Sequence, residues 1–393
     1  MQLAHKIEIK PTEEQAKKLE CACGCARFAY NWGLAKWKEM YEEWKKDNSK
    51  IKPNIYRVRK EFNNIKKSQF PWIYDSPKDA NQQAFFNLGF AFKMLWKKVG
   101  KYPKFKSKKS KKSFYVGNDR IKINGNYITL PKIGVVKMTE ILRFNGKIMN
   151  GVVSKVANKW FISILVDTIC VKKTNIKNKV VGIDMGLKNF ATLSTGEKIE
   201  APQFLRKLQK KLSRRQKQNS RKKFDSNNRK KSNLKLSKVH YKIWCKRNDF
   251  LHKLSHKICR ENQMICLEDL AIKNMKKNRR LATSIGDAGW AEFKRQIKYK
   301  SKIFGNNIFF ADKFFASSKI CSNCGYKKQK LLLSERVFVC DKCKSTLDRD
   351  INAAINLSRL GHSRIYACGH ETSTNSISEL ASIVDDTRTQ MQI

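Results

Sequence analysis

Residues 179–195 read KVVGIDMGLKNFATLST, and this stretch decides the fold of the C-terminal half. The apolar run Val180–Ile183 ends at Asp184, and a second strand pattern, FATLST, follows closely. A carboxylate at the end of a buried strand costs free energy unless a cation meets it. We therefore expect a metal ion beside Asp184, with further ligands from elsewhere in the chain.

The composition predicts a nucleic-acid partner. The 393 residues include 84 Lys and Arg against 33 Asp and Glu, a formal net charge of +51. Such an excess repels itself unless a polyanion neutralises it. The 41% of hydrophobic residues and the length predict two or three folded domains. Because the positive charge is spread along the chain, a membrane-surface protein is the weaker interpretation.

The N-terminus predicts a cytoplasmic protein without a membrane partner. MQLAHKIEIKPTEEQ lacks the apolar segment of a signal peptide, and no apolar run reaches the length of a membrane span. In the cytoplasm, the twelve cysteines are not expected to form disulfides.

Four cysteines predict a structural zinc site. Cys321 and Cys324 form one CxxC knuckle, and Cys340 and Cys343 form a second after fifteen intervening residues. Two knuckles at this separation match a closed, tetrahedral four-thiolate site, which organises the fold and does not catalyse.

Three acids predict a magnesium site. Asp184 ends one strand, Glu268 ends another in ICLEDL, and Asp350 begins a helix in LDRDINAAINL. Carboxylates on adjacent elements of a mixed α/β sheet suit two Mg²⁺ ions, which stabilise the attacking and leaving oxygens of a phosphodiester. Asp350 could instead be a helix cap. The neighbouring acids Asp269 and Asp348 remain alternatives at this stage.

The N-terminal half is predicted to be helical and then β-rich. Helical patterns cover 11–48 and 79–98, and a basic loop covers 101–113. Hairpin signals follow in 120–130 and 146–168. These strands predict either a small barrel that grips a nucleic-acid backbone or a plain β connector.

The C-terminal half alternates strands with helices. Strand signals at VVGIDMG, FATLST, KIEA, MICLEDL and NIFFAD surround a polar, helix-compatible stretch, 206–260. Within that stretch Lys and Arg far outnumber the two acids, Asp225 and Asp249. A one-sided run of this kind favours phosphate contact over a merely solvated face.

Taken together, the motifs resemble the TnpB family, RNA-guided DNA endonucleases encoded by bacterial and archaeal insertion sequences. The resemblance rests on GIDMGLKNFATLS, FLHKLSHKI, CLEDLAIKNM, DAGWAEFKRQIKYKSKIFG, FFASSKICSNCG and STLDRDINAAINL in this order. Upstream, CARFAYNWGLAKWKEMYE and DANQQAFFNLGFAFK extend it to nearly the whole chain.

The resemblance implies an α+β multidomain fold. It places a wedge β-barrel, a helical recognition domain, and a RuvC-like nuclease of RNase H fold interrupted by a zinc ribbon along the chain. The implied boundaries are wedge 1–10 and 101–178; recognition domain 11–100; nuclease 179–316 with the basic helical segment 203–262; zinc ribbon 317–346; third nuclease motif 347–360; and a disordered tail 361–393.

The resemblance also implies roles for residues. Asp184, Glu268 and Asp350 fill the three catalytic positions and hold two Mg²⁺, and the four cysteines hold one Zn²⁺. The partners are a guide RNA and a double-stranded DNA target, bound by a monomer acting at the bacterial or archaeal nucleoid, with sequence read by base pairing. Candidate nucleic-acid contacts from the family positions and the basic segments are Tyr30, Asn31, Gln82, Gln83, Lys104, Lys106, Lys108, Arg214, Arg215 and Arg221.

The sequence departs from the family pattern at two positions. Leu347 stands where the family often has His, and Lys344 follows Cys343 where Gly is usual. Neither change removes a predicted ligand. The alternative functions are a miniature type V CRISPR effector, a transposase, and a guided DNA-binding regulator without nuclease activity.

Overall fold

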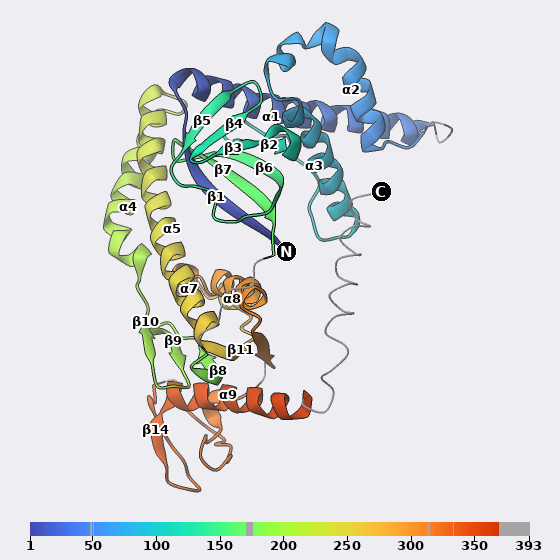
Figure 1. Ribbon diagram of the computed structural model, residues 1–393. Helices are drawn as coiled ribbons and strands as arrows, with labels where there is room; N and C mark the ends of the chain where they lie inside the picture. The colour runs from blue at the N-terminus through green and yellow to red at the C-terminus, as the bar shows by residue number, and fades with distance from the viewer. Residues whose placement is uncertain (48, 50, 170–175, 313–314, 333, 369–393) are drawn as a thin grey trace. The chain divides into compact units, whose positions relative to one another are not determined.

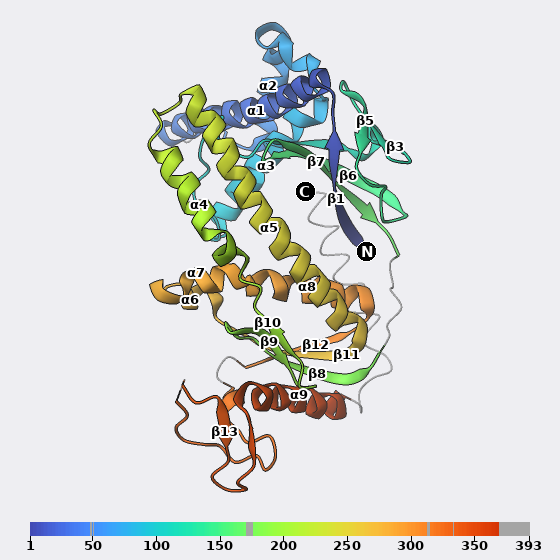
Figure 2. The ribbon, with the colours of Figure 1, turned by 90° about the vertical axis from the view of Figure 1, so that its left-hand side faces the viewer.

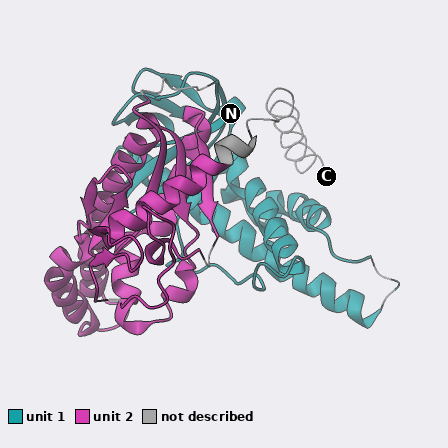
Figure 3. Cartoon of the chain, turned by 90° about the horizontal axis from the view of Figure 1, so that it is seen from below, with its two compact units in different colours: residues 1–170 teal, residues 171–393 magenta. Residues whose placement is uncertain are grey.

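The computed structural model describes residues 1–47, 49, 51–169, 176–312, 315–332 and 334–368 (Figure 1). Its contacts divide the chain into two compact units, residues 1–170 and 171–393 (Figure 3). Within the described residues, no helix combines the length and the apolar character that crossing a membrane requires.

Unit 1 combines three long helices with a seven-stranded sheet. Its elements are β1 Gln2–Lys10, α1 Glu13–Lys46, α2 Ile55–Gln69, η1 Pro71–Asp75, α3 Lys78–Trp96, β2 Ser113–Gly117, η2 Asn118–Arg120, β3 Lys122–Asn124, β4 Tyr127–Leu130, β5 Gly134–Met138, β6 Lys147–Val156 and β7 Lys159–Asp167.

The predicted helices of unit 1 are present. α1 begins where the sequence indicates, because the Thr12 hydroxyl accepts a hydrogen bond from the Gln15 amide and the Gln15 side chain accepts one from the Thr12 amide. α3 matches the predicted segment 79–98 within two residues at each end. The sequence analysis missed α2, which fully buries only Val58 and Phe62 and is rich in polar residues.

The prediction that the wedge domain forms a closed barrel is wrong, because the described strands form an open sheet. The strand order is β2-β6-β7-β1-β5-β4-β3, with β2 and β3 at opposite edges. Helices cover one face instead: Leu19 and Ala22 of α1 and Ala80 of α3 pack against Ile7, Val116 and other sheet residues. At the β2 edge, the Gly117 amide donates to Asp79 of α3 over 2.8 Å. A sheet whose face is already buried by helices has no need to close on itself.

Both predicted hairpins are confirmed. β3 and β4 turn at Gly125, and β6 and β7 turn at Ala157 and Asn158. All three turn residues have positive φ, which matches the right-handed twist of the flanking strands.

Unit 2 is a mixed α/β sheet with helices on both faces (Figure 2). Its elements are β8 Asn178–Asp184, β9 Asn189–Leu193, β10 Lys198–Glu200, α4 Phe204–Ser220, α5 Asn227–Glu261, β11 Asn262–Glu268, α6 Ile272–Met275, α7 Arg279–Ala288, α8 Trp290–Phe304, β12 Asn307–Ala311, η3 Ser317–Lys319, β13 Val337–Val339, β14 Thr346–Asp348 and α9 Arg349–Cys368.

The sheet of unit 2 has the order β10-β9-β8-β11-β12. β8 runs antiparallel to β9 and parallel to β11, and β11 runs parallel to β12. The antiparallel hairpin of β8 and β9 explains why KVVGIDMGLKNFATLST is decisive: the first strand of the chain in this sheet is also its centre.

The pleat of β8 and β11 sends alternate side chains to two different cores. Val181 and Ile183 pack with α5 and α8, whereas Val180 packs with Leu357 of α9. The same alternation holds in β11, where Cys266 faces α9 and Leu267 faces α5 and α8. The sheet is therefore buried on both faces, as is usual for parallel strands.

Helix α9 lies directly against the backbone of β8. A Cβ atom on Gly182 would lie 2.0 Å from the Ala354 carbonyl oxygen and 2.5 Å from the Ser358 nitrogen. Farther along α9, a Cβ on Gly361 would lie 2.3 Å from the Cys266 sulfur. Only glycine at these two positions permits so close an approach of helix and sheet.

The polar tail predicted from residue 361 begins later than expected. α9 continues to Cys368, so residues 361–368 are helical. The rest of the predicted tail, 369–393, lies outside the described residues.

Gly182→Ala is expected to lower the free energy of unfolding of unit 2 by about 1–3 kcal/mol, because the new methyl group meets helix backbone that cannot rotate away. Urea unfolding measures the change. Gly286→Ala is the matched control, since a Cβ there meets nothing within 4 Å. Equal unfolding midpoints for the two variants would contradict the packing described for α9.

Candidate active site

Asp184 and Glu268 stand side by side at the ends of β8 and β11. The last paired residues of these parallel strands are Ile183 and Leu267, so the two acids follow immediately on both strands. Both continue the alternation that faces α9, as Val180 and Cys266 do. Register and pleat together bring the two carboxylates to one edge and one face of the sheet.

Asp350 approaches the same edge from α9. It lies in the first turn of the helix, one turn before Ala354, the residue that packs on Gly182 of β8. The negative charge of Asp350 acts directly on Asp184. The structure therefore brings together the three acids that the sequence singles out.

The electrostatics of the cluster are unfavourable without a cation. Burial, followed by the charges of Glu268 and Asp350, raises the pKa of Asp184 to about 7. Burial also raises the pKa of Glu268. A carboxylate cluster with raised pKa values lacks positive charge, which a bound metal ion would supply.

The donor set suits Mg²⁺, which prefers hard oxygen ligands and takes few from protein. Asp184, Glu268 and Asp350 each offer carboxylate oxygens near this edge of the sheet. Carboxylates shared in this way could hold a pair of ions about 4 Å apart.

The two alternative acids have structural partners. Asp348 accepts hydrogen bonds from the Asp350 and Ile351 amides at the start of α9, and Lys198 lies 2.6 Å from its other oxygen. Although burial opposes it, these partners hold the pKa of Asp348 below its usual value. Asp269 is more than half exposed and pairs with Lys294. Asp348 caps the helix that presents Asp350.

Arg349 contacts the third acid. Its Nε and Nη2 donate to Asp350 Oδ1 over 3.3 and 3.2 Å, and its Nη1 donates to the Glu335 carbonyl over 2.9 Å. Arg349 thereby joins the cysteine-rich segment to Asp350 and supplies part of the positive charge that the acids need.

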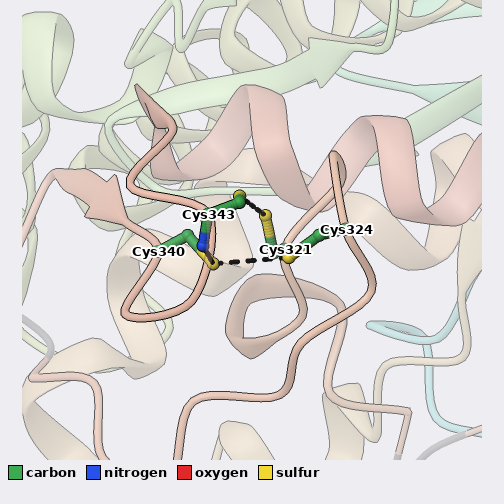
Figure 4. A group of neighbouring side chains, drawn as sticks. All are labelled: Cys321, Cys324, Cys340 and Cys343. Carbon is green, nitrogen blue, oxygen red and sulfur yellow. Dashed lines mark hydrogen bonds between the residues drawn. The ribbon is translucent and has the colours of Figure 1, made fainter.

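The four predicted zinc ligands converge (Figure 4). Their sulfur atoms all lie within 4.8 Å of one another, with 3.7 Å between Cys321 and Cys343 and 3.5 Å between Cys324 and Cys340. A tetrahedral ion with Zn–S bonds of about 2.3 Å requires sulfur separations of about 3.8 Å. The cluster therefore fits a zinc ion.

Neighbouring donors lower the pKa of the Cys321 and Cys343 thiols, whereas the other sulfurs of the cluster raise the pKa of Cys324 to about 11. The Ser345 hydroxyl lies 3.1 Å from the Cys343 sulfur and lowers the pKa of that thiol to about 5. The Asn323 amide donates to the Cys321 sulfur, and the Cys343 amide donates to the Cys340 sulfur. Because metals bind the thiolate, these contacts prepare the site for an ion.

Different residues follow the two CxxC knuckles in the left-handed backbone conformation. Gly325 follows the first knuckle with φ of 76°, and Lys344 follows the second with φ of 60°. This left-handed conformation costs nothing for glycine but about 1–2 kcal/mol for a residue with a side chain. The unusual Lys344 noted in the sequence therefore places strain beside the second pair of cysteines.

The candidate residues of α1, Tyr30 and Asn31, hold the basic loop in place at Lys106. Tyr30 is buried, and the Lys106 ammonium lies 3.7 Å from the centre of its ring. Asn31 holds the same residue by its backbone, donating to the Lys106 carbonyl and accepting from its amide. Burial lowers the pKa of Lys106. Lys104 and Lys108 on either side are exposed.

The remaining candidate nucleic-acid contacts lie in α3 and in the α4–α5 hairpin. Gln82 and Gln83 are half-buried in α3, and Gln83 lines a cavity of about 330 Å³ beside the basic loop. In the α4–α5 hairpin, Arg214 and Arg221 are exposed and Arg215 is half-buried. A small apolar seam, including Leu212, Val239 and Ile243, packs the two helices of that hairpin together.

Sequence reasoning missed several residues that hold the acids in place. Ser317 donates a hydrogen bond to Glu268, and Asn352 and Asn356 of α9 bind the chain segment that contains Ser317. The available signal was the pair of asparagines one helical turn apart within the otherwise apolar NAAINL. Buried amides at that spacing require partners.

Comparison with known proteins agrees with the motifs. A family model described as "Probable transposase" matches residues 161–279, and one described as "Cas12f1-like, TNB domain" matches 290–357. A third, described as "Helix-turn-helix domain", matches 1–46, where the structure has β1 followed by the single helix α1.

Curated relatives align over almost the entire chain. A Streptomyces pristinaespiralis protein named "Putative RNA-guided DNA endonuclease" is 35% identical over 373 residues, covering 93% of this chain and 90% of the relative. This chain belongs to the TnpB family. An Escherichia coli K12 member, "Putative RNA-guided DNA endonuclease InsQ", is 31% identical over 382 residues, covering 93% of this chain and 94% of the relative.

Solved structures resemble this TnpB-family chain more weakly. The "Cryo-EM structure of the Cas12f1-sgRNA-target DNA complex" is 17% identical, with a TM-score of 0.35 over 91% of this chain and 99% of the other. A likeness of this size adds no argument to the sequence relationship.

The raised pKa of Asp184 predicts a pH-dependent stability. Because the folded chain holds a proton on Asp184 up to about pH 7 and the unfolded chain only to its ordinary value of 3.8, the free energy of unfolding falls as the pH rises through this window. The ceiling on this fall is about 4 kcal/mol. Asp184→Asn should remove most of it.

Urea unfolding at pH 5 and pH 8 without added Mg²⁺ tests this expectation. Asp184→Asn should stabilise the protein most at pH 8 and by roughly a third as much at pH 5, because pH 5 lies only about one unit above the ordinary pKa of the carboxyl group. Asp269→Asn is the control for removing an exposed charge. An equal effect of Asp184→Asn at both pH values would contradict the electrostatic account.

Lys344→Gly is expected to tighten zinc binding by about fivefold, because relief of the left-handed conformation returns about 1 kcal/mol. Competition with a chromogenic chelator measures the affinity. Lys342→Gly in the same turn is the control. Weaker zinc binding by Lys344→Gly would show that the lysine side chain makes a compensating contribution.

Proposed function

We propose that this protein is an RNA-guided DNA endonuclease of a transposable element. The observation that carries the proposal is the convergence of Asp184, Glu268 and Asp350 at one sheet edge in a chain of net charge +51. The names of its relatives in the TnpB family support the guided reaction.

In this proposal, unit 2 contains a RuvC-like nuclease of RNase H fold. The mixed sheet with acids at the ends of two parallel strands supports it. The three acids would hold two Mg²⁺ ions, which when bound stabilise the attacking and leaving oxygens of a phosphodiester. Hydrolysis adds one water across a P–O bond, leaving a phosphate on one product end and a hydroxyl on the other.

The chain's own groups prepare that reaction. Asp348 caps α9 and so sets the position of Asp350, while Arg349 steadies the Asp350 carboxylate. Burial of Asp184 limits competition from water for the metal ligands. The four cysteines hold one structural Zn²⁺, whose sphere is complete and takes no part in catalysis.

The nucleic-acid partners are a transposon-derived guide RNA and double-stranded target DNA. Base pairing reads the sequence, and the protein contributes charge and recognition of a short motif beside the target. The exposed cations of the α4–α5 hairpin and of the basic loop supply phosphate contacts. We assign the sheet of unit 1 as the wedge and α1–α3 as the recognition domain, in a monomer with one RNA acting at the nucleoid.

Purified protein with its locus-derived RNA should cut a matched target in Mg²⁺. Asp184→Ala and Asp350→Ala should each reduce cleavage by more than about 100-fold while guide and target binding persist, since even indirect partners of metal ligands account for 10–100-fold. Asp269→Asn should cleave like the parent, because Asp269 pairs with Lys294 outside the cluster.

Three outcomes would contradict the proposal. Cleavage by Asp184→Ala at the parent rate would remove the acids from the reaction. Target binding without cleavage by the parent would indicate a guided regulator. Strand joining in the absence of RNA would indicate a transposase.

A further inference from the structure

We propose that Ser317 is a positioning residue for Glu268, and that the segment carrying Ser317 is locked to α9 so that the zinc ribbon and the acid site form one mechanical unit. The role in cleavage rests on the function proposed above. The effect on metal binding stands on the contacts themselves.

The first contact is between Ser317 and the acid. The Ser317 hydroxyl donates a hydrogen bond to Glu268 Oε1, and Ser317 is only 4% exposed. Glu268 has a longer side chain than Asp184 or Asp350, and hence one more torsion to fix before it can bind a metal. A buried donor on one oxygen fixes that torsion and leaves the other oxygen free to turn toward the cation.

The second set of contacts immobilises the segment that carries Ser317. The Asn356 amide donates to the carbonyls of Ser317 and Ile320 over 2.8 and 2.6 Å. Asn352, one turn earlier on α9, also donates to the Ile320 carbonyl, over 2.7 Å. Its side-chain oxygen accepts from the Ser322 amide over 2.8 Å.

Both asparagines are buried, so these bonds are not exchangeable with water. Asn352 is fully buried and Asn356 is 4% exposed. Loss of the Asn356 side chain would leave the Ser317 carbonyl without its donor, and loss of the Asn352 side chain would leave the Ser322 amide without its acceptor, at a cost of about 1–3 kcal/mol for each group. The segment from Ser317 to Ser322 therefore moves only together with α9.

The same helix sets the third acid. Asp350 lies two residues before Asn352 in the first turn of α9, and Cys321, a predicted zinc ligand, lies between the residues that the asparagines bind. On the other side of the ribbon, Arg349 joins the Glu335 carbonyl to Asp350. The start of the cysteine-rich segment is thus tied to Glu268 through Ser317, and the stretch between its two knuckles is tied to Asp350 through Arg349.

These contacts give Ser317 a positioning role and not a direct role in catalysis. Ser317 is the first residue of η3, its side chain is buried, and its hydroxyl is occupied by Glu268. Its removal should weaken metal binding by misplacing Glu268, without changing guide RNA or target binding.

Binding of Mn²⁺ to the full-length, zinc-loaded protein tests the proposal. Electron paramagnetic resonance measures the free ion, and Asp184→Ala provides the background of other sites. Ser317→Ala should raise the dissociation constant by about tenfold, the lower end of the range for partners of metal ligands. Ser317→Thr, which keeps the hydroxyl, should bind close to the parent, and Ser318→Ala serves as the neighbouring control.

Cleavage gives the second readout. The Mg²⁺ concentration at half-maximal cleavage should rise in Ser317→Ala by about the same factor as the Mn²⁺ dissociation constant. Zinc content should equal that of the parent, which shows that the ribbon is intact. Ser317→Cys, similar in size but a weak donor, should behave like Ser317→Ala and covers the case in which alanine loosens the fold.

The outcomes separate this inference from the proposed function. Mn²⁺ affinity and Mg²⁺ dependence of Ser317→Ala and Ser317→Cys equal to those of Ser318→Ala would overturn the positioning role. A tenfold loss of Mn²⁺ affinity in a protein whose parent form fails to cut any guided target would support the positioning role and reject the endonuclease.

Discussion

The close packing of α9 on β8 is the constraint on which the candidate site depends. At Gly182 the helix backbone lies where any side chain would stand. This contact fixes the distance and direction of α9 relative to the sheet. It therefore also fixes the position of the first helical turn, which contains Asp350. Because Gly182 lets the helix backbone approach this closely, Asp350 in the first turn of α9 lies near Asp184. A side chain at position 182 would hold the helix away from the sheet and draw Asp350 away from the other acids.

The electrostatic consequence is a small region of negative charge in a strongly basic protein. Three carboxylates repel one another at the sheet edge, and the pKa of Asp184 rises to about 7 as a result of burial and its two neighbours. The protein tolerates this cost because nearby groups fix the carboxylates: Arg349 on Asp350 and Ser317 on Glu268. Positive charge elsewhere attracts the polyanion, while the acids attract the cations that its hydrolysis requires.

Much of the fold could be predicted from local pattern. The strand that ends at Asp184, the basic helical stretch and both hairpins follow from periodicity and turn residues, and the four cysteines from their spacing. That the first sheet stays open could not be predicted, because it depends on α1 and α3 covering one face, a contact between segments distant in sequence. α2 was missed because its buried stripe is only two residues wide.

The sequence patterns identified candidate acids for the site, but not which of the neighbouring acids belong to it or what holds them in place. Choosing Asp350 over Asp348 required either the family pattern or the structure, in which Asp348 is the helix cap. The roles of Ser317 and Asn356 are invisible in sequence, since a serine in a loop and an asparagine in a helix have many common uses. Their function arises from a tertiary contact, as does the burial of Tyr30 under Lys106.

The central claim is that the half-buried acids at the sheet edge form a divalent-cation site. Anomalous diffraction from crystals soaked in Mn²⁺ tests it most directly, with the zinc signal at Cys321, Cys324, Cys340 and Cys343 as an internal standard. The account predicts manganese density among Asp184, Glu268 and Asp350. Zinc density at the cysteines with no manganese density among the acids would contradict it.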